Sequence, residues 1–223
     1  MPPSKAHVPH RPLILATTNP GKLREFRALL AGLPYDLHSL GELGIPPAAE
    51  TGATFLENAM LKARHAAAAA SIAGLDRAVS AVTAIADDSG LEVDALGGAP
   101  GILSARYAGA GADDAANNAK LLGVLAGMCP EQRRARYRCA LVLVFGGDDE
   151  APLTAEGVWE GTIIDMPRGS NGFGYDPYFW LPDLEMTAAQ LTAADKNKLS
   201  HRGMAMRALR DQLIGREQSA VRP

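Results

Sequence analysis

Two neighbouring carboxylates follow a short apolar run in the first half of the chain. Asp87 and Asp88 come directly after Ala84-Ile85-Ala86, which we interpret as the end of a buried strand. Adjacent carboxylates are costly to bury unless something positive compensates for them. Because successive strand residues point to opposite faces, we expect one acid to face a metal and a substrate and the other to be held by backbone N–H groups. An acid-rich turn that caps the next element is the alternative.

A polar turn near the start of the chain has the chemistry of a phosphate site. It lies between an apolar run and a helical pattern, so a helix N-terminus would present its N–H groups and positive dipole end to an anion. It is not a Walker A loop, because GxxxxGK followed by Ser or Thr is absent. A plain strand-to-helix turn with a solvated lysine is the alternative. The turn consists of Thr17, Thr18, Asn19, Pro20, Gly21 and Lys22.

Two later segments carry side chains that suit a nucleotide. Glycines around two aromatic residues would let a ring lie flat on a base, a contact worth about 1–3 kcal/mol. A cationic cluster at a helix start can meet phosphate or a base edge, and its histidine can donate a hydrogen bond. An aromatic-anchored turn and a solvated surface pair are the alternatives. The candidates are Phe173, Gly174, Tyr175 and Asp176 in the first segment and Lys196, His201 and Arg202 in the second.

Glu50 follows a Pro-Pro pair in a loop and on its own would be a surface carboxylate. It gains a role as a second oxygen ligand for a metal at Asp88, since Mg²⁺ prefers a few carboxylates together with water and phosphate oxygens.

The elements that must position these residues follow from hydrophobic spacing and turn signals. Strands and helices mix without strict alternation, which predicts an α/β fold with some antiparallel pairing. Residues 137–145 and 153–164 are expected to form a hairpin, and Thr54 and Glu57 have the spacing of a capping box. The expected strands are 13–17, 35–40, 84–88, 91–96, 137–145 and 153–164, and the expected helices are 22–30, 54–73, 113–126 and 200–214.

The bulk composition excludes several classes of protein. A formal net charge of -3 gives no reason to expect binding to nucleic-acid polymers or anionic membranes. Cys129 and Cys139 have no metal-ligand spacing and are expected to be reduced thiols. No apolar run approaches a membrane span and no signal peptide is evident, so we expect a cytoplasmic protein. We expect one domain over 12–215, a disordered tail over 1–11 and a C-terminal tail over 216–223.

Taken in order, these segments resemble one family, the non-canonical purine nucleoside triphosphate pyrophosphatases, also called inosine/xanthosine triphosphate pyrophosphatases. The likeness runs from about Leu13 to Ile214. Thr18 stands where many members have glycine, and 74–83 is longer than in compact members. The segments that carry the resemblance are 17–22, 50–52, 55–59, 86–91, 97–101, 104–107, 172–177 and 200–203.

The resemblance implies an elongated mixed sheet flanked by helices, with two lobes, a nucleotide cleft between them and a homodimer. It also implies Mg²⁺-dependent hydrolysis of ITP, XTP and their deoxy forms to the monophosphate and pyrophosphate. By the family pattern Asp88 is the catalytic carboxylate and a metal ligand, with Glu50 as the second ligand. The turn 17–22 binds the triphosphate, while Ser89, 173–176, Lys196 and 201–202 contact the nucleotide.

We expect Asp88 to orient or deprotonate a water that attacks the α-phosphorus, while Lys22 and Lys196 stabilise the leaving pyrophosphate. Donors from His201 or Arg202 would pair with the O6 acceptor of a 6-keto purine. Two alternatives stay open: a related pyrophosphatase for other modified or canonical nucleotides, and a non-catalytic nucleotide-binding regulator. A P-loop kinase or GTPase is disfavoured by the missing Walker A pattern.

Overall fold

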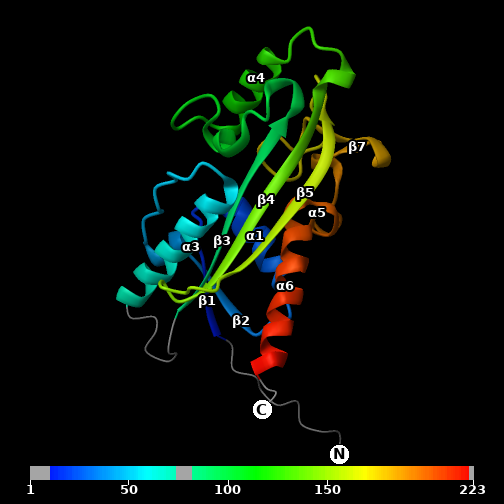
Figure 1. Ribbon diagram of the computed structural model, residues 1–223. Helices are drawn as coiled ribbons and strands as arrows, with labels where there is room; N and C mark the ends of the chain where they lie inside the picture. Colours follow the sequence, from blue (N-terminus) through cyan, green and yellow to red (C-terminus); the bar gives the residue numbers. More distant parts are fainter. Residues whose placement is uncertain (1–10, 74–81, 221–223) are drawn as a thin grey trace, which may run out of the picture.

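A seven-stranded mixed sheet of order β2-β1-β3-β4-β5-β6-β7 forms the centre of the protein (Figure 1). The computed structural model describes residues 11–73 and 82–220. β1 runs parallel to both β2 and β3, and every later neighbouring pair is antiparallel. The α/β expectation and the 137–145/153–164 hairpin are confirmed. The strands are β1 (Arg11–Leu15), β2 (Tyr35–Ser39), β3 (Thr83–Val93), β4 (Arg134–Phe145), β5 (Leu153–Ile163), β6 (Phe179–Leu181) and β7 (Met186–Thr187).

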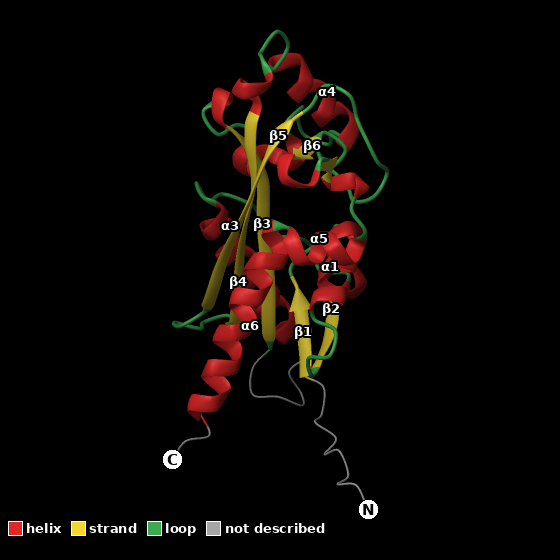
Figure 2. Cartoon of the chain, turned by 90° about the vertical axis from the view of Figure 1, so that its right-hand side faces the viewer, coloured by secondary structure: helices red, strands yellow, loops and turns green. Residues whose placement is uncertain are grey.

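Helices cover both faces of the sheet. α3 packs on one face and α1 with α6 on the other, so that the long strands β3, β4 and β5 lie between them (Figures 1 and 2). α4 lies at the far end of these strands, where a separate apolar cluster forms a second lobe. The helices are α1 (Pro20–Leu29), α2 (Leu40–Leu43), α3 (Phe55–Ile72), α4 (Asp114–Val124), α5 (Ala193–Leu199) and α6 (His201–Ala220).

The alternation of β3 decides which face each of its side chains reaches. Ala84 and Ala86 belong to the cluster beneath α3, whereas Ile85 belongs to the cluster beneath α1 and α6. Asp87 therefore points toward α6 and Asp88 toward α3. The expectation that the two acids face opposite ways is confirmed by their ion pairs, Asp87 with Arg202 of α6 and Asp88 with Lys62 of α3.

Small residues let α3 lie close to the sheet. Its buried face carries five alanines, and alanine combines the best helix propensity with the least bulk. The Thr54 hydroxyl accepts the Glu57 N–H at 3.1 Å, as expected for an N-cap. Glu57 reaches the N–H of Ala53 at 2.7 Å rather than that of Thr54, so the capping box is completed one residue earlier than its usual form.

The carboxyl end of β1 lies at a switch in topology. β1 pairs with β3 only over Leu13 to Leu15, so the ladder between these strands stops before Asp87. The helix that follows β1 lies on one face of the sheet, and the helix that precedes β3 lies on the other. In open α/β sheets a ligand crevice forms outside strand ends at such a point. The turn 17–22 starts here, beside the two aspartates.

Several elements differ from the sequence expectations. The two strands expected at 84–88 and 91–96 are one strand, β3, because Ser89 and Gly90 stay in register opposite Cys139 and Arg138. α6 extends beyond the expected end to Ala220. The elements α2, α5, β6 and β7 were not expected. The tail expected over residues 1–11 lies outside the described residues except for Arg11, and the 74–83 insertion does so except for its last two residues.

None of the helices in the described ranges is both long enough and apolar enough to span a membrane.

Candidate active site

A cavity of about 200 Å³ brings together most of the expected nucleotide-binding residues. It lies on the face of β3 that carries Ser89, between the 17–22 turn, the aromatic loop and the start of α6. Asp88 and Glu50 lie on the other face of the sheet, next to α3. The expected residues that line the cavity are Asn19, Lys22, Ser89, Phe173, Gly174, Tyr175, Asp176, Lys196, His201 and Arg202.

Asp87 is the buried anchor of the cations that face this cavity. Its carboxylate pairs with Lys22 and accepts from Arg202 Nε at 3.0 Å, the Ser89 hydroxyl at 2.7 Å and the Cys139 thiol at 3.1 Å. Burial alone would raise the pKa of Asp87, but Arg202 and Lys22 outweigh it and hold this pKa well below its usual range. Asp87 therefore stays ionised. The expected backbone N–H partners were wrong, because charged and polar side chains hold this carboxylate.

Asp88 is bound on one side only. Oδ1 accepts from Lys62 Nζ at 2.6 Å, whereas Oδ2 is buried and has no hydrogen-bond partner among the described residues. Burial raises the pKa of Asp88 above its ordinary value despite the opposing effect of Lys62, and the charge of Glu50 adds to the rise. A carboxylate with a free oxygen and a raised pKa is well suited to accept a proton.

Glu50 shares Lys62 with Asp88. Lys62 Nζ lies 3.1 Å from Glu50 Oε1, and the other Glu50 oxygen accepts from Arg106 at 2.5 Å. Burial raises the pKa of Glu50, but Arg106 and Lys62 outweigh it, so that this pKa lies below its ordinary value. Asp88 and Glu50 are thus two carboxylates arranged around a single cationic group.

This arrangement fits a magnesium ion. Among the described side chains, no group of three His, Cys, Asp or Glu residues forms a ready-made metal site. Mg²⁺ does not need one, since it is usually held by one or two carboxylates together with water and substrate phosphates. Asp88 Oδ1 and Glu50 Oε1 already face one cationic group, Lys62 Nζ, at 2.6 and 3.1 Å, so a metal ion beside it could meet both carboxylates and still leave Asp88 Oδ2 free. The residues present therefore match a site shared between the protein and a phosphate ligand.

The 17–22 turn caps its own helix. Asn19 Oδ1 accepts the N–H groups of Gly21 at 2.7 Å and Lys22 at 3.1 Å, and Thr17 Oγ1 accepts the N–H of Asn19. Two of the N–H groups that we expected to face an anion are thus occupied by Asn19. The Lys22 ammonium and the exposed side chains of this turn are the groups that it leaves available to a ligand.

The aromatic loop is held at Gly174 by α4. The Gly174 N–H donates to Asp114 Oδ2 at 2.7 Å, and its carbonyl accepts from Asn118 Nδ2 at 2.9 Å. Phe173 lies over Gly21, where a Cβ atom would lie 2.8 Å from the ring. This close approach explains why the second residue of α1 is glycine, and it places the Phe173 ring at the edge of the cavity.

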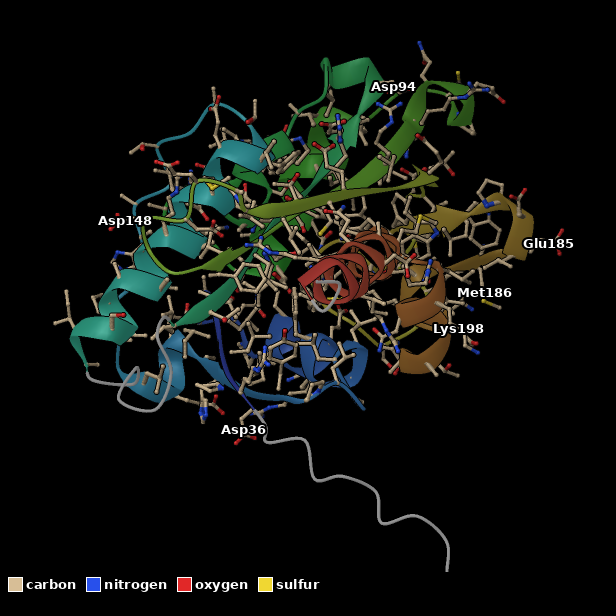
Figure 3. All side chains as sticks on the ribbon, turned by 60° about the horizontal axis from the view of Figure 1, so that its bottom comes forward. Asp36, Asp94, Asp148, Glu185, Met186 and Lys198 are labelled. Carbon is tan, nitrogen blue, oxygen red and sulfur yellow. The ribbon has the colours of Figure 1, made fainter. Side chains whose placement is uncertain are left out.

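Asp176 and Lys196 form the floor beneath Phe173. Asp176 Oδ2 accepts from Lys196 Nζ at 2.5 Å and from the Phe173 N–H at 2.9 Å, and Lys196 also pairs with Glu25 at 3.0 Å. Lys196 Nζ lies 4.9 Å from the centre of the Phe173 ring. Lys198, labelled in Figure 3, points outward two positions further along α5. Lys196 is therefore the lysine of this helix that serves the cavity.

The start of α6 places an imidazole and a guanidinium in the cavity. His201 stacks on Tyr137, with the ring centres 4.7 Å apart and the planes at 10°, and its Nδ1 is buried without a partner among the described residues. Burial and the charge of Arg202 hold the pKa of His201 well below its ordinary value, so the ring is neutral. Arg202 pairs with Asp87 and Glu25. α6 approaches closely because Gly157 of β5 has no side chain.

Four charged residues of this region were not expected as site residues: Lys62, Glu25, Arg106 and Asp114. Lys62 had a signal, because it lies at i+4 from Asn58 on the face of α3 that otherwise carries alanines. A lysine on a buried helical face needs a carboxylate partner, and Asp88 supplies it. Glu25 had no local signal, since its partners are far away in the sequence, whereas Arg106 lies in the segment 104–107 that carries the resemblance but received no role there.

Comparisons with known proteins point to one family. Residues 13–212 match a family model described as the Ham1 family. A "dITP/XTP pyrophosphatase" of Thioalkalivibrio sulfidiphilus is 50% identical over 92% of this chain and 99% of its own length, and one of Ralstonia nicotianae is 53% identical over 91% and 96%. Among solved structures, a HAM1 protein from Coxiella burnetii matches with a TM-score of 0.80 at 42% identity, covering 92% of this chain and 99% of its own.

Proposed function

The chain belongs to the Ham1 family, and we propose that it hydrolyses ITP, XTP and their deoxy forms to the nucleoside monophosphate and pyrophosphate. One observation carries the proposal above the others: a cavity walled by aromatic and charged side chains and a carboxylate with a free oxygen lie on either side of the same strand, where the ladder between β1 and β3 ends. A nucleotide whose base enters the cavity can pass its phosphates over this open edge toward Asp88.

The base end of the site favours a 6-keto purine. Phe173 offers a ring for stacking, a contact worth about 1–3 kcal/mol. Arg202 is a permanent donor, and a neutral His201 with hydrogen on Nδ1 would donate as well. An O6 acceptor would satisfy such donors, whereas the 6-amino group of adenine would leave them unpaired. Sites that match hydrogen bonds discriminate by about 10⁴ or more.

The phosphate end supplies the groups for water attack. Lys62 holds Asp88 Oδ1, so Oδ2 is the oxygen that takes a proton from water as the water attacks the α-phosphorus. Lys22, together with the exposed side chains of the 17–22 turn, stabilises the pyrophosphate that leaves. We expected Lys196 to share this role, and its contacts with Asp176 and Phe173 favour a role at the base end instead.

Mg²⁺ would be held by Asp88 and Glu50, and it would neutralise phosphate charge and make a bound water more acidic. A metal ion is needed because each cationic side chain of the site is already paired with a carboxylate. A triphosphate entering this site brings negative charge that no excess of protein cations meets. The five cations are Lys22, Lys62, Arg106, Lys196 and Arg202, and the five carboxylates that pair with them are Glu25, Glu50, Asp87, Asp88 and Asp176.

We also propose that the protein forms a homodimer, that it is located in the cytoplasm and that nucleic-acid polymers are not among its partners.

A panel of nucleotides with separate detection of pyrophosphate and orthophosphate tests the function. We expect kcat/KM for ITP and XTP to exceed that for ATP, which lacks the O6 acceptor, with pyrophosphate as the product. Guanine shares O6 but adds a 2-amino group, so a lower value for GTP would rest on the shape of the pocket. Equal values for all four nucleotides would indicate a general nucleotide pyrophosphatase that does not select by base. Binding without any product would leave a nucleotide-binding regulator, and release of orthophosphate would point to a different bond.

A further inference from the structure

One of the five cations of the site differs from the others in exposure. The Arg106 side chain is 39% exposed, whereas the other four have 17% or less. Arg106 can therefore change its direction at little cost. Lys62, Lys196 and Arg202 cannot, because each is buried between two carboxylates.

Arg106 also comes from the other side of the cleft. It is the last residue of the 3₁₀ helix η2 (Gly101–Arg106), whose neighbouring residues Ser104 and Ala105 line the cavity. Its partner Glu50 lies in the loop that leads into α3. Their bond of 2.5 Å continues the series Asp88, Lys62, Glu50 and Arg106, in which negative and positive groups alternate. Arg106 is thus placed at the phosphate end of the site.

We propose that Arg106 is a further substrate-binding residue. When a divalent cation binds Glu50, Arg106 would be released from Glu50 and bind the phosphates instead, which would bring η2 over the pyrophosphate group. This role rests on the proposed function. Glu50 already serves two cations, and a metal ion would compete with both for its oxygens. The released guanidinium is planar and presents paired N–H groups, which match two oxygens of a phosphate.

Direct binding of inorganic pyrophosphate, measured by calorimetry, tests this exchange without turnover. In Mg²⁺, Arg106→Ala should bind pyrophosphate about tenfold more weakly than the wild type, the cost of one charge-assisted hydrogen bond. In EDTA, where Glu50 keeps Arg106, the two proteins should bind it equally. Arg106→Lys should recover only part of the affinity, because an ammonium lacks the planar fork.

Glu50→Gln provides a test of opposite sign. It frees Arg106 without a metal, so in EDTA this variant should bind pyrophosphate more tightly than the wild type. The double variant Glu50→Gln/Arg106→Ala should lose that gain, and the difference isolates the pair. Arg27→Ala is the matched control, because its ion pair with Glu42 has the same length of 2.5 Å and lies within one lobe. It should leave binding of pyrophosphate unchanged in both buffers.

The outcomes separate this role from the proposed function. Equal pyrophosphate affinity of Arg106→Ala and the wild type in Mg²⁺ overturns the exchange, as does a gain for Glu50→Gln that persists in the double variant. Inhibition by IMP should be unchanged in Arg106→Ala, and a parallel loss there would mean general damage to the cleft instead. Failure of the wild type to release pyrophosphate from ITP would overturn the proposed function, while the binding comparison would still decide the role of Arg106.

Discussion

Asp88 leaves one buried oxygen without a partner while Lys62 holds the other. Asp88→Asn keeps the size of this side chain and removes its ability to take a proton. Proton transfer by a positioned group contributes about 10²–10⁴-fold. We therefore expect turnover of ITP to fall by about that factor with only a modest loss of nucleotide binding, because Glu50 and the substrate phosphates would still be available to Mg²⁺. Single-turnover kinetics with a separate measurement of affinity checks this, and near-wild-type turnover would remove Asp88 from the chemistry.

Asp87→Asn is the informative comparison, because it should impair stability and binding rather than the chemical step. Asp87 compensates Lys22 and Arg202 in a buried place, and removal of one partner from a buried ion pair costs about 3–5 kcal/mol. This variant should lose stability and nucleotide affinity together. Loss of turnover with normal stability would mean that the roles of the two acids are exchanged.

His201 makes the stability of the fold depend on pH. The folded protein keeps this imidazole neutral, because burial and Arg202 lower its pKa, whereas the unfolded chain takes up a proton below about pH 6.5. The stabilisation is complete above that pH and is lost as the pH falls toward the folded pKa. Between pH 6.5 and pH 5.5, the free energy of unfolding measured with urea should fall by about 1 kcal/mol more in the wild type than in His201→Phe. Equal losses would mean that His201 titrates normally.

Individual site residues could be predicted where chemistry shows in the local sequence. The pair Asp87 and Asp88 follows an apolar run, and period two then sends them to opposite faces. Their partners could not be predicted, because Lys62 and Arg202 become neighbours only when α3 and α6 pack on the sheet. The assignment of Asn19 as a self-cap also depends on geometry that spacing does not contain.

At the scale of elements, the close approach of α6 to β5 depends on the absence of a side chain at one position of β5. A Cβ atom on Gly157 would lie 2.0 Å from the His201 carbonyl oxygen. Gly157→Ala must therefore push the start of α6 away from the sheet, which we expect to cost about 1–3 kcal/mol. Because His201 and Arg202 move with the helix, the KM for ITP should rise as well.

Gly123→Ala is the matched control, since a Cβ there meets nothing within 4 Å. This change in α4 should be neutral or stabilising. Urea unfolding and ITP kinetics on both variants check the pair. Equal behaviour of Gly157→Ala and Gly123→Ala would show that α6 does not depend on this close contact.

Long periodic elements could be predicted and short ones could not. α3, β4 and β5 have clear spacing over many residues. β6 and β7 have three and two residues, too few for any period to be visible. β3 was divided in the prediction because Ser89-Gly90 is typical of a turn, yet these residues stay in the ladder. Gly90 is required there, since a Cβ would lie 2.3 Å from the Gly101 carbonyl oxygen.

At the scale of the molecule, the cleft is electrically balanced before any ligand binds. Each of its five cations is paired with a carboxylate, and Asp114 adds a further acid to the cavity, so the protein supplies no surplus positive charge for a triphosphate. Removal of divalent cations with EDTA should therefore abolish turnover and weaken ITP binding, and added Mg²⁺ should restore both. Isothermal titration in the two buffers checks this. Undiminished turnover in EDTA would mean that protein cations suffice.

The α/β class followed from the mixture of elements, but the arrangement of the sheet did not. The order β2-β1-β3-β4-β5 places the end of β1 beside Asp87 and Asp88, although about 70 residues separate the two segments in the chain. The two lobes arise because β3, β4 and β5 are long enough to contribute to the apolar clusters beneath α1, α3 and α6 at one end and to a separate cluster at the other. Strand length could be estimated from the sequence, whereas strand order depends on tertiary packing.

The central claim is that water attacks the α-phosphorus beside Asp88, and hydrolysis of ITP in ¹⁸O-labelled water tests it most directly. Mass spectrometry of the products reports which phosphorus gained the new oxygen. Attack at the α-phosphorus places the label in IMP and leaves the pyrophosphate unlabelled, and this is the result that we predict. Label in the pyrophosphate, or label in orthophosphate released with IDP, would contradict the account.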